Sequence, residues 1–259
     1  MMGQCRAVLR VTLAALLTAT AIIPGLFTRR FTPRFHAVLV MLYCRSLVRI
    51  FGVRLKISGE IPRHACGTLF VSNHISYLDV PIFGAHHPVR FTPKAEIRSW
   101  PVLGFLTGLT GAFYIERRAG SAKEQQEKLR AALEAGDNVL LFAEGTTSDG
   151  SHVLPFKSSL FAVVEPVAGK PEIPVRMMAL AYTKVLGKPP KSGRMLDRVA
   201  WYGDMTFAPH IWALLTMRGV EAELRYFPEL RWSDFNDRKA LAKHCEEAIR
   251  GAVAERAAV

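Results

Sequence analysis

The hydrophobic positions of this 259-residue chain change their period near residue 55. Residues 11–27 contain no charged side chain, and a second apolar stretch runs from Phe35 to Val53. In that stretch Arg45 and Arg49 are four residues apart, so they share one face of a helix. From Lys56 onward, short apolar runs alternate with segments of helical period. The pattern predicts an N-terminal pair of helices (1–54) followed by one α/β domain (55–259).

Six runs are the candidate strands, because they are short, apolar and bounded by turn residues. They are Thr68–Asn73, Val89–Lys94, Gly111–Glu116, Asn138–Glu144, Ile173–Tyr182 and Ala222–Phe227. A helix is expected after the third run, where Ser121 and Glu124 form a capping box and Gly136 is a typical stop. A last helix is expected from Ser233 to near Arg256. We therefore predict a mixed, mostly parallel sheet flanked by helices.

The N-terminal apolar segment is near the lower length limit, roughly 17–25 residues, for a helix that spans a bilayer. A basic stretch before an apolar core is also typical of a cleaved signal peptide. The apolar character resumes at Phe35, however, which favours a retained membrane anchor whose second helix lies in or against the interface. Arginines flank the first segment on both sides, so the positive-inside rule leaves its orientation open.

The charge balance indicates an anionic partner. Lys and Arg number 34 against 22 Asp and Glu, which gives a net charge of +12. Such an excess suits nucleic acid, an acidic lipid surface or a phosphorylated ligand. The chain has no Cys/His finger spacing, no RNA-binding motif and no dense basic block, so we expect a bilayer with anionic lipids and no nucleic acid. Its four cysteines lie far apart, and their spacing predicts neither a zinc site nor a disulfide framework.

A candidate catalytic pair follows the first predicted strand of the domain. Asn73 and His74 come directly after the apolar run, and Asp79 lies five residues beyond the His. Within one regular helix, His74 and Asp79 would point about 140° apart. They can meet only if His74 lies on a turn and Asp79 in the first turn of a helix. Asp79 then orients the imidazole and leaves its other nitrogen as a base. A loop-capping His and a helix-capping Asp without chemistry explain this segment equally well.

Two other predicted strands end in polar residues. These are Glu116, Arg117 and Arg118 after one strand, and Glu144, Gly145 and Thr146 after another. In open α/β sheets, ligands bind at the carboxyl ends of the strands, so the three strand ends indicate one shared site. Taken alone, the arginines would be a solvated pair and Gly145 a turn glycine.

In order and spacing, four segments resemble the motifs of the glycerolipid acyltransferases, the lysophosphatidate (1-acylglycerol-3-phosphate) acyltransferase family. The segment "NHISYLD" resembles the Asn-His-x4-Asp motif, and "GAFYIER" resembles the second block. The segment "FAEGTTS" is similar to the third block, Phe-Pro-Glu-Gly-Thr-Arg-Ser, and "IPVRMMAL" to the fourth, an apolar run around Pro174. The resemblance covers about Ile57 to Tyr182. It implies acyl transfer from an acyl-CoA or acyl-carrier-protein thioester to a lysolipid hydroxyl, without metal or cofactor. We expect this reaction at the cytoplasmic face of a bacterial inner membrane.

The resemblance also implies roles for individual residues. His74 would deprotonate the hydroxyl and Asp79 would orient His74, so that the alkoxide attacks the thioester directly. The chain has no G-x-S-x-G elbow for a nucleophilic serine. Arg117 would hold an anionic group, and Lys94 would stabilise developing negative charge. The remaining expected substrate-binding residues are Asn73, then Glu144, Gly145 and Thr146 in the acceptor pocket, Lys157 as a further cation, and Pro174 in the pocket wall.

The third block departs from the family pattern at two positions. Ala143 replaces the Pro, and Thr147 replaces the Arg that is expected to touch the acceptor phosphate. The longer run "AEGTTSDGSHVLPFKSSLF" and the segment "AWYGDM" (Ala200–Met205) resemble the branch that acylates lyso-ornithine lipid, which carries no phosphate. Two acceptors therefore stay open, lyso-ornithine lipid and lysophosphatidate or another lysophospholipid. Two other function classes also stay open: a non-catalytic, basic lipid-binding protein on the same fold, and a thioester hydrolase.

Overall fold

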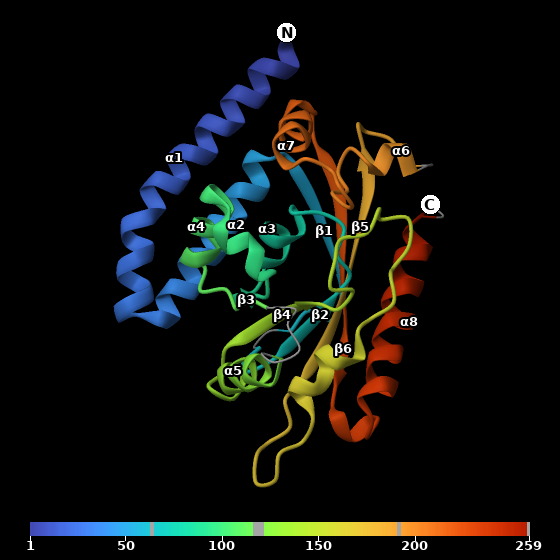
Figure 1. The fold of residues 1–259 in the computed structure, drawn as a ribbon. Helices are drawn as coiled ribbons and strands as arrows, with labels where there is room; N and C mark the ends of the chain where they lie inside the picture. The colour runs from blue at the N-terminus through green and yellow to red at the C-terminus, as the bar shows by residue number, and fades with distance from the viewer. Residues whose placement is uncertain (63–64, 116–121, 191–192, 258–259) are drawn as a thin grey trace.

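A computed structural model describes residues 1–62, 65–115, 122–190 and 193–257 (Figure 1). Its two N-terminal helices, α1 (Met2–Phe31) and α2 (Pro33–Ile50), pack against each other along one side of an α/β domain. Pro33 is the first residue of α2, and a residue before proline disfavours the helical conformation, so the chain turns at Thr32. The predicted helical pair is present. Its second helix ends at Ile50, three residues early, because a strand begins at Val53.

Six strands form one sheet in the order β1-β6-β5-β2-β4-β3. The strands are β1 (Val53–Gly59), β2 (Leu69–Ser72), β3 (Val89–Phe91), β4 (Asn138–Phe142), β5 (Val175–Val185) and β6 (Val220–Leu230). Every neighbouring pair is parallel except β5 and β6, which are antiparallel. The prediction of a mixed, mostly parallel sheet is confirmed.

One predicted strand does not form in the described residues. The run Gly111–Glu116, as far as Ile115, makes only an isolated bridge between Ile115 and Lys94. Phe113 and Ile115 donate backbone hydrogen bonds to the carbonyls of Phe91 and Pro93, at 2.8 and 2.9 Å. Pro93 has no N–H to return such a bond, so the pairing cannot extend into a regular ladder.

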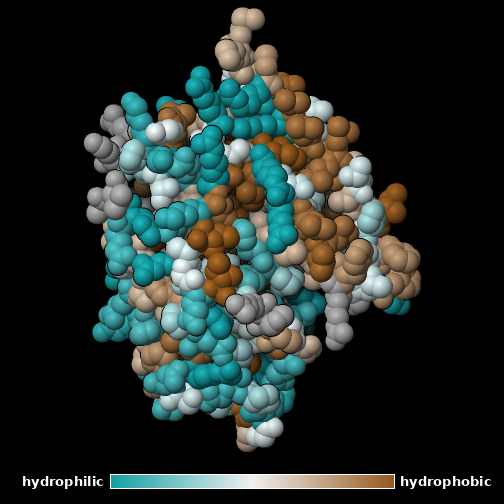
Figure 2. All heavy atoms as spheres, turned by 180° about the vertical axis from the view of Figure 1, so that it is seen from behind, coloured by the Kyte–Doolittle hydropathy of each residue, from teal (hydrophilic) through white to brown (hydrophobic). Residues whose placement is uncertain are grey.

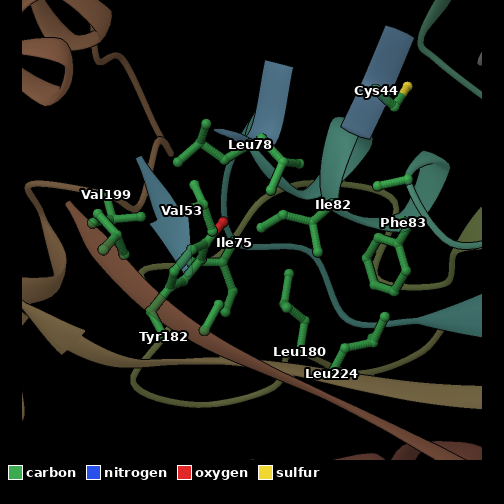
Figure 3. Packing of buried hydrophobic residues seen from close by; sticks show 14 of the residues in the cluster. Cys44, Val53, Ile75, Leu78, Ile82, Phe83, Leu180, Tyr182, Val199 and Leu224 are labelled. Atoms are coloured by element: carbon green, nitrogen blue, oxygen red, sulfur yellow. The ribbon is translucent and has the colours of Figure 1, made fainter. Parts of the chain in front are cut away.

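Helices cover both faces of the sheet, and each face has its own hydrophobic core. The helices of the domain are α3 (Asp79–Gly84), α4 (Pro101–Leu109), α5 (Ala122–Glu134), α6 (Gly193–Leu196), α7 (Phe207–Thr216) and α8 (Arg238–Ala257), with 3-10 turns η1 (Ala95–Ser99), η2 (Ser158–Val164) and η3 (Trp232–Asp234). One core lies under α2, α3 and α7, where Ile82 of α3 lies above Leu180 and Leu224 of the sheet (Figure 3). The other lies under α5, η2 and α8.

The two helices predicted in the domain are present with shifted ends. The helix expected from Ser121 runs from Ala122 to Glu134, and Ser121 itself lies outside the described residues. The C-terminal helix begins at Arg238 rather than Ser233. Before it, η3 ends and Asn236 takes a left-handed conformation (φ 56°), which interrupts the helical path.

Candidate active site

The loop between β2 and α3 carries the Asn-His pair, and Asn73 fastens this loop to the neighbouring strand. The Asn73 side chain is buried and exchanges two hydrogen bonds with the backbone of Leu180 in β5, both 2.9 Å long. β2 ends at Ser72, and beyond it the Asn73 side-chain amide makes the hydrogen bonds to β5 that backbone groups make within the sheet. The Asn73 side chain therefore contacts β5 and is shielded from solvent.

His74 and Asp79 meet in the geometry that the sequence requires, with His74 on the loop and Asp79 at the first residue of α3. The Asp79 Oδ2 atom lies 2.8 Å from His74 Nδ1. The same oxygen accepts the backbone N–H groups of Ile75 (2.6 Å) and Ser76 (2.9 Å). The carboxylate therefore caps the turn and also faces the imidazole. The capping interpretation and the catalytic interpretation of this segment are thus compatible.

The imidazole of His74 is held on its face as well as at Nδ1. Its ring stacks on Phe142, the last residue of β4, with centroids 3.8 Å apart and planes 9° apart. The side chain is 18% exposed. When Nδ1 carries the proton that Asp79 accepts, Nε2 keeps its lone pair. No protein hydrogen bond reaches Nε2 from the described part of the chain, so this nitrogen can accept a proton from a bound molecule.

Glu144, which follows β4, supports the loop from behind. One carboxyl oxygen accepts the backbone N–H of His74 (2.6 Å), and the other accepts that of Leu154 (2.8 Å). Burial raises the pKa of Glu144 to about 7, and these two hydrogen bonds oppose that shift. The negative charge of Asp79 adds to the increase. Glu144 thus contacts the backbone of the His74 loop, whereas the resemblance implies a place in the acceptor pocket.

A tight turn after Glu144 brings Lys157 to the same edge of the sheet. Gly145 has a φ of +69°, a backbone conformation that favours glycine, and Lys157 Nζ lies over it, 2.7 Å from where a Cβ atom would be. Lys157 is exposed and Thr146 is half-buried. The next residues turn back to the loop, because Ser148 donates its backbone N–H to the carbonyl of His74 (2.8 Å).

The other predicted cations take different places. Lys94 lies just beyond the carboxyl end of β3 and is half-buried. The register pairs Phe91 with Leu140, and Leu140 with Phe70, so Lys94 is about two strand spacings, roughly 10 Å, from the His74 loop. Arg117 lies outside the described residues.

The structure does not bring Pro174 to this edge. The Pro174 carbonyl accepts the backbone N–H of Leu69, the first residue of β2 (2.9 Å). Because β5 runs parallel to β2, that position is at the opposite end of the strands, about 16 Å from His74. The expectation that Pro174 shapes the pocket wall is corrected accordingly.

Two residues at the site have no role in the sequence analysis. One is Phe142, and the other is Tyr182 of β5, whose buried hydroxyl donates to Asp79 Oδ1 (2.6 Å). Side chains alternate between the two faces of β5, so Leu180 and Tyr182 must face the same side of the sheet. This alternation is the sequence signal that could have pointed to Tyr182. Only the hydrogen bond from Tyr182 to Asp79 shows that this is the side of the His-Asp pair.

The segment Ala200–Met205 also packs against the loop. Trp201 donates its backbone N–H to the carbonyl of Ile75 (2.9 Å). Tyr77 lies edge-on to Trp201, and its hydroxyl hydrogen-bonds to Nδ1 of His210 in α7 (2.9 Å). Aromatic residues therefore form one side of the site.

Comparisons with known proteins identify the family to which this chain is similar. A family model described as "Acyltransferase" matches residues 54–178. The chain is 38% identical to the lyso-ornithine lipid O-acyltransferase of Brucella abortus over 211 residues, which are 80% of this chain and 78% of that protein. It is 34% identical to the protein of the same name from Rhodobacter capsulatus, over 88% of this chain and 79% of that one.

Relatives with another acceptor in their names match nearly as well. The 1-acyl-sn-glycerol-3-phosphate acyltransferase of Neisseria meningitidis is 31% identical, over 82% of this chain and 79% of that protein. The crystal structure of the 1-acyl-sn-glycerophosphate acyltransferase PlsC from Thermotoga maritima superposes with a TM-score of 0.67, over 97% of this chain and 94% of that one. At 20% identity, this last likeness shows a shared fold.

Proposed function

From the premise that this chain belongs to the acyltransferase family, we propose that it moves a fatty acyl chain to the hydroxyl of lyso-ornithine lipid, with His74 as the general base. It is an enzyme of lipid biosynthesis, and its reaction requires an acyl donor and a lysolipid acceptor. The observation that carries the proposal is the contact of His74 Nδ1 with the buried Asp79 carboxylate, which leaves Nε2 for the acceptor hydroxyl.

In the proposed reaction, Nε2 of His74 removes the hydroxyl proton as the oxygen attacks the thioester carbonyl carbon. Asp79 stabilises the imidazolium that forms. The tetrahedral intermediate then breaks its C–S bond, and the imidazolium returns the proton to the leaving thiolate. A base positioned in this way contributes roughly 10²–10⁴-fold to the rate. The thioesters of CoA and of acyl carrier protein both satisfy this chemistry.

The neighbouring residues divide into two groups. Asn73 and Glu144 hold the loop, because both are buried and bonded to backbone groups. Thr146 and Lys157, exposed or half-buried beside Gly145, line the acceptor side. Lys94 stabilises negative charge on the thioester oxygen, and Arg117 binds an anionic group of a substrate.

Two observations support lyso-ornithine lipid as the acceptor. Two relatives of that name are 34% and 38% identical and two others are 30% identical, against 31% for the glycerophosphate enzyme. Thr147 stands where the family motif has a phosphate-binding Arg. A site without that Arg suits an acceptor that carries no phosphate.

We further propose that α1 and α2 hold the enzyme in one leaflet, at the cytoplasmic face where the thioester donors are found. Among the described helices, α1 is the one long and apolar enough to cross a bilayer. However, both of its ends contact the catalytic domain: Arg10 donates to the carbonyls at the end of α7, and Arg29 donates to the carbonyl of Gly108 in α4. A helix held at both ends on one domain cannot place those ends on opposite sides of a membrane.

The outward face of the helical pair suits burial in lipid. Large exposed apolar residues lie along α1 and the first part of α2. Figure 2 shows this face in brown along the right-hand side of the molecule. They include Val8, Leu9, Leu13, Leu16, Ile23, Leu26, Phe27 and Phe31 of α1 and Phe35, Val38 and Leu42 of α2. Such a face, with Arg29 and Arg30 exposed near the end of α1, is typical of an interfacial helix on anionic lipid. We therefore take 1–54 as the membrane unit and 55–259 as the catalytic domain.

One assay tests these proposals. Membranes containing the protein receive labelled acyl-CoA or acyl carrier protein and, separately, lyso-ornithine lipid, lysophosphatidate or another lysophospholipid. We expect labelled ornithine lipid from the wild type, none from His74→Ala, and wild-type rates from His152→Ala, whose ring is exposed. Free fatty acid without an acceptor would indicate a hydrolase, and lipid binding without turnover would indicate a non-catalytic protein. Labelled phosphatidate as the main product would replace the proposed acceptor.

A further inference from the structure

The Asp79 carboxylate has a second anchor besides the loop that it caps. The side chain is completely buried, and a buried carboxylate must be hydrogen-bonded to stay ionised. Its Oδ2 atom faces His74 and two backbone N–H groups of the loop. Its Oδ1 atom accepts one hydrogen bond in the described structure, from the hydroxyl of Tyr182 at 2.6 Å.

Tyr182 reaches Asp79 from a rigid part of the molecule. Strand β5 is paired with β2 on one side and with β6 on the other. The ring of Tyr182 lies in the core next to Ile75, which precedes Ser76 in the loop (Figure 3). The Tyr182 hydroxyl donates to Asp79, and the negative charge of Asp79 adds to the effect of burial in raising the pKa of Tyr182. A carboxylate oxygen can only accept, so the Tyr182 hydroxyl turns its proton toward Asp79.

Building on the proposed function, we propose that Tyr182 is a positioning residue for the general base. Its hydroxyl fixes the rotation of the Asp79 carboxylate and holds part of the negative charge on Oδ1. Oδ2 therefore stays aimed at His74 Nδ1, in the tautomer that leaves Nε2 ready to take the proton from the acceptor hydroxyl. Tyr182 acts through Asp79 and touches no reacting atom.

This role has a consequence for the pH dependence of the reaction. Without the hydroxyl, the charge of Asp79 is less dispersed and binds the imidazolium of His74 more tightly, so more alkaline conditions are needed to free the base. The other titratable groups around Asp79 are Tyr182, Tyr77 and Glu144. Burial raises the pKa values of both tyrosines, which are therefore neutral near neutral pH. Glu144 titrates in this range, but it is the same in every variant compared.

The chain offers a matched control in the next strand. Tyr226 of β6 is also buried, and its register partner on β5 is Met178. Its hydroxyl has no hydrogen-bond partner within the described residues. Tyr182→Phe and Tyr226→Phe therefore remove the same atom from the same core, and only the first removes a bond to Asp79.

The test is the pH profile of kcat/KM for acyl transfer. For Tyr182→Phe we expect a fall of about 10-fold at neutral pH, with the acidic limb moved to higher pH and the acceptor KM unchanged. Tyr226→Phe keeps the wild-type profile. The proposal is overturned if the profile of Tyr182→Phe has the shape of the wild-type profile, or if Tyr226→Phe shifts it equally.

A second variant keeps the test valid should Tyr182→Phe fold poorly. Replacing Tyr182 alone with 3-fluorotyrosine keeps the hydroxyl and makes it a stronger donor, so the acidic limb should move to lower pH. An unmoved limb in this protein counts against the role. If the wild type transfers no acyl chain, the proposed function fails together with this inference. A second result separates the two: the wild type is active, His74→Ala is inactive, and both Tyr182 variants keep the wild-type profile. In that case the proposed function stands and only the inference about Tyr182 is wrong.

Discussion

The imidazole of His74 lies flat against the phenyl ring of Phe142, with the two centroids 3.8 Å apart. Phe142 ends β4, and Phe83 of α3 meets it edge-on at 5.8 Å, so the ring is itself fixed from a second side. His74 is therefore held by Asp79 at Nδ1 and by Phe142 over its face. An imidazole with both degrees of freedom restrained presents Nε2 in one direction, which is the preorganisation that a general base requires.

Removing the Phe142 ring should lower turnover without removing any polar group from the site. We expect Phe142→Ala to reduce kcat about 10-fold, because the imidazole gains freedom to rotate away from the acceptor. Phe142→Tyr keeps a flat ring and should keep most of the activity. Initial rates over a range of acceptor concentrations measure both. Equal activity of Phe142→Ala and the wild type would show that the stacking does not orient His74.

Asn73 is expected to matter for folding more than for substrate affinity. Asn73→Ala leaves the backbone N–H and C=O of Leu180 without their partners in the core. Each lost buried bond costs about 1–2 kcal/mol, so the free energy of unfolding should fall by about 2–4 kcal/mol. Urea unfolding followed by fluorescence measures this, and Glu127→Ala, at an exposed position of α5, provides the control. A stable Asn73→Ala protein with a raised acceptor KM would instead support direct substrate contact.

Glu144 should make the protein less stable as the pH rises through the range from about 4.5 to 7. Because its pKa in the folded protein is about 7, above the usual value of 4.5, the folded state binds more protons than the unfolded state in this range. The stabilisation is therefore fully present below about pH 4.5 and is lost as the pH rises to 7. Glu144→Gln has no proton to lose there.

The measurement is the difference in unfolding free energy between wild type and Glu144→Gln at several pH values. This difference should change by about 1–3 kcal/mol between pH 4.5 and 7, in favour of the variant at the higher pH. A difference that stays constant over the range would mean that Glu144 is ionised throughout. Glu127, which is exposed, offers a second carboxyl for comparison through Glu127→Gln.

The sequence predicts the His74–Asp79 pair because its geometry is local. Five residues, a turn and a helix start are enough to bring the two side chains together, and no distant segment is needed. The alternation of strands and helices likewise predicts the sheet class. By contrast, the pattern does not predict β1, because its short run directly follows an apolar helix and continues the same hydrophobic pattern.

The supporting contacts of the site could not be predicted in the same way. Glu144 follows a strand end, which predicts its edge of the sheet but not that its carboxyl bonds to the His74 backbone. Tyr182 and Asn73 are connected through β5, and only the strand order reveals that connection. Pro174 illustrates the opposite error. A residue that precedes a parallel strand lies at the amino ends of the strands, away from a site at their carboxyl ends.

Arg10 should couple the membrane helix to the catalytic domain. Its guanidinium is buried and donates to three carbonyls at and just after the end of α7, those of Leu215, Met217 and Arg218. These are groups that a helix end leaves unpaired and that attract a cation. Arg10→Ala should lower the unfolding free energy by about 1–3 kcal/mol. Arg10→Lys should recover only part of this, because an ammonium lacks the planar fork.

The effect on membrane binding separates coupling from simple destabilisation. We expect the Arg10→Ala protein to float with anionic vesicles as the wild type does, because the apolar face of α1 is intact, but to lose activity on vesicle-bound acceptor. Activity on acceptor dispersed in detergent should be affected less. Equal losses in both assays would show that Arg10 contributes only to stability.

Thr147→Arg should change which acceptor the enzyme prefers. Thr147 is half-buried and directly precedes Ser148, whose backbone N–H binds the carbonyl of His74, so a longer side chain here reaches the acceptor side of the site. A guanidinium binds phosphate oxygens in pairs and repels an amine. We expect kcat/KM for lysophosphatidate to rise at least about 10-fold and kcat/KM for lyso-ornithine lipid to fall. Ser151→Arg, at an exposed position of the same loop, adds the same charge and should leave the ratio of the two unchanged. Competition between both acceptors in one vesicle measures this ratio directly, and an equal shift in both variants would trace it to net charge alone.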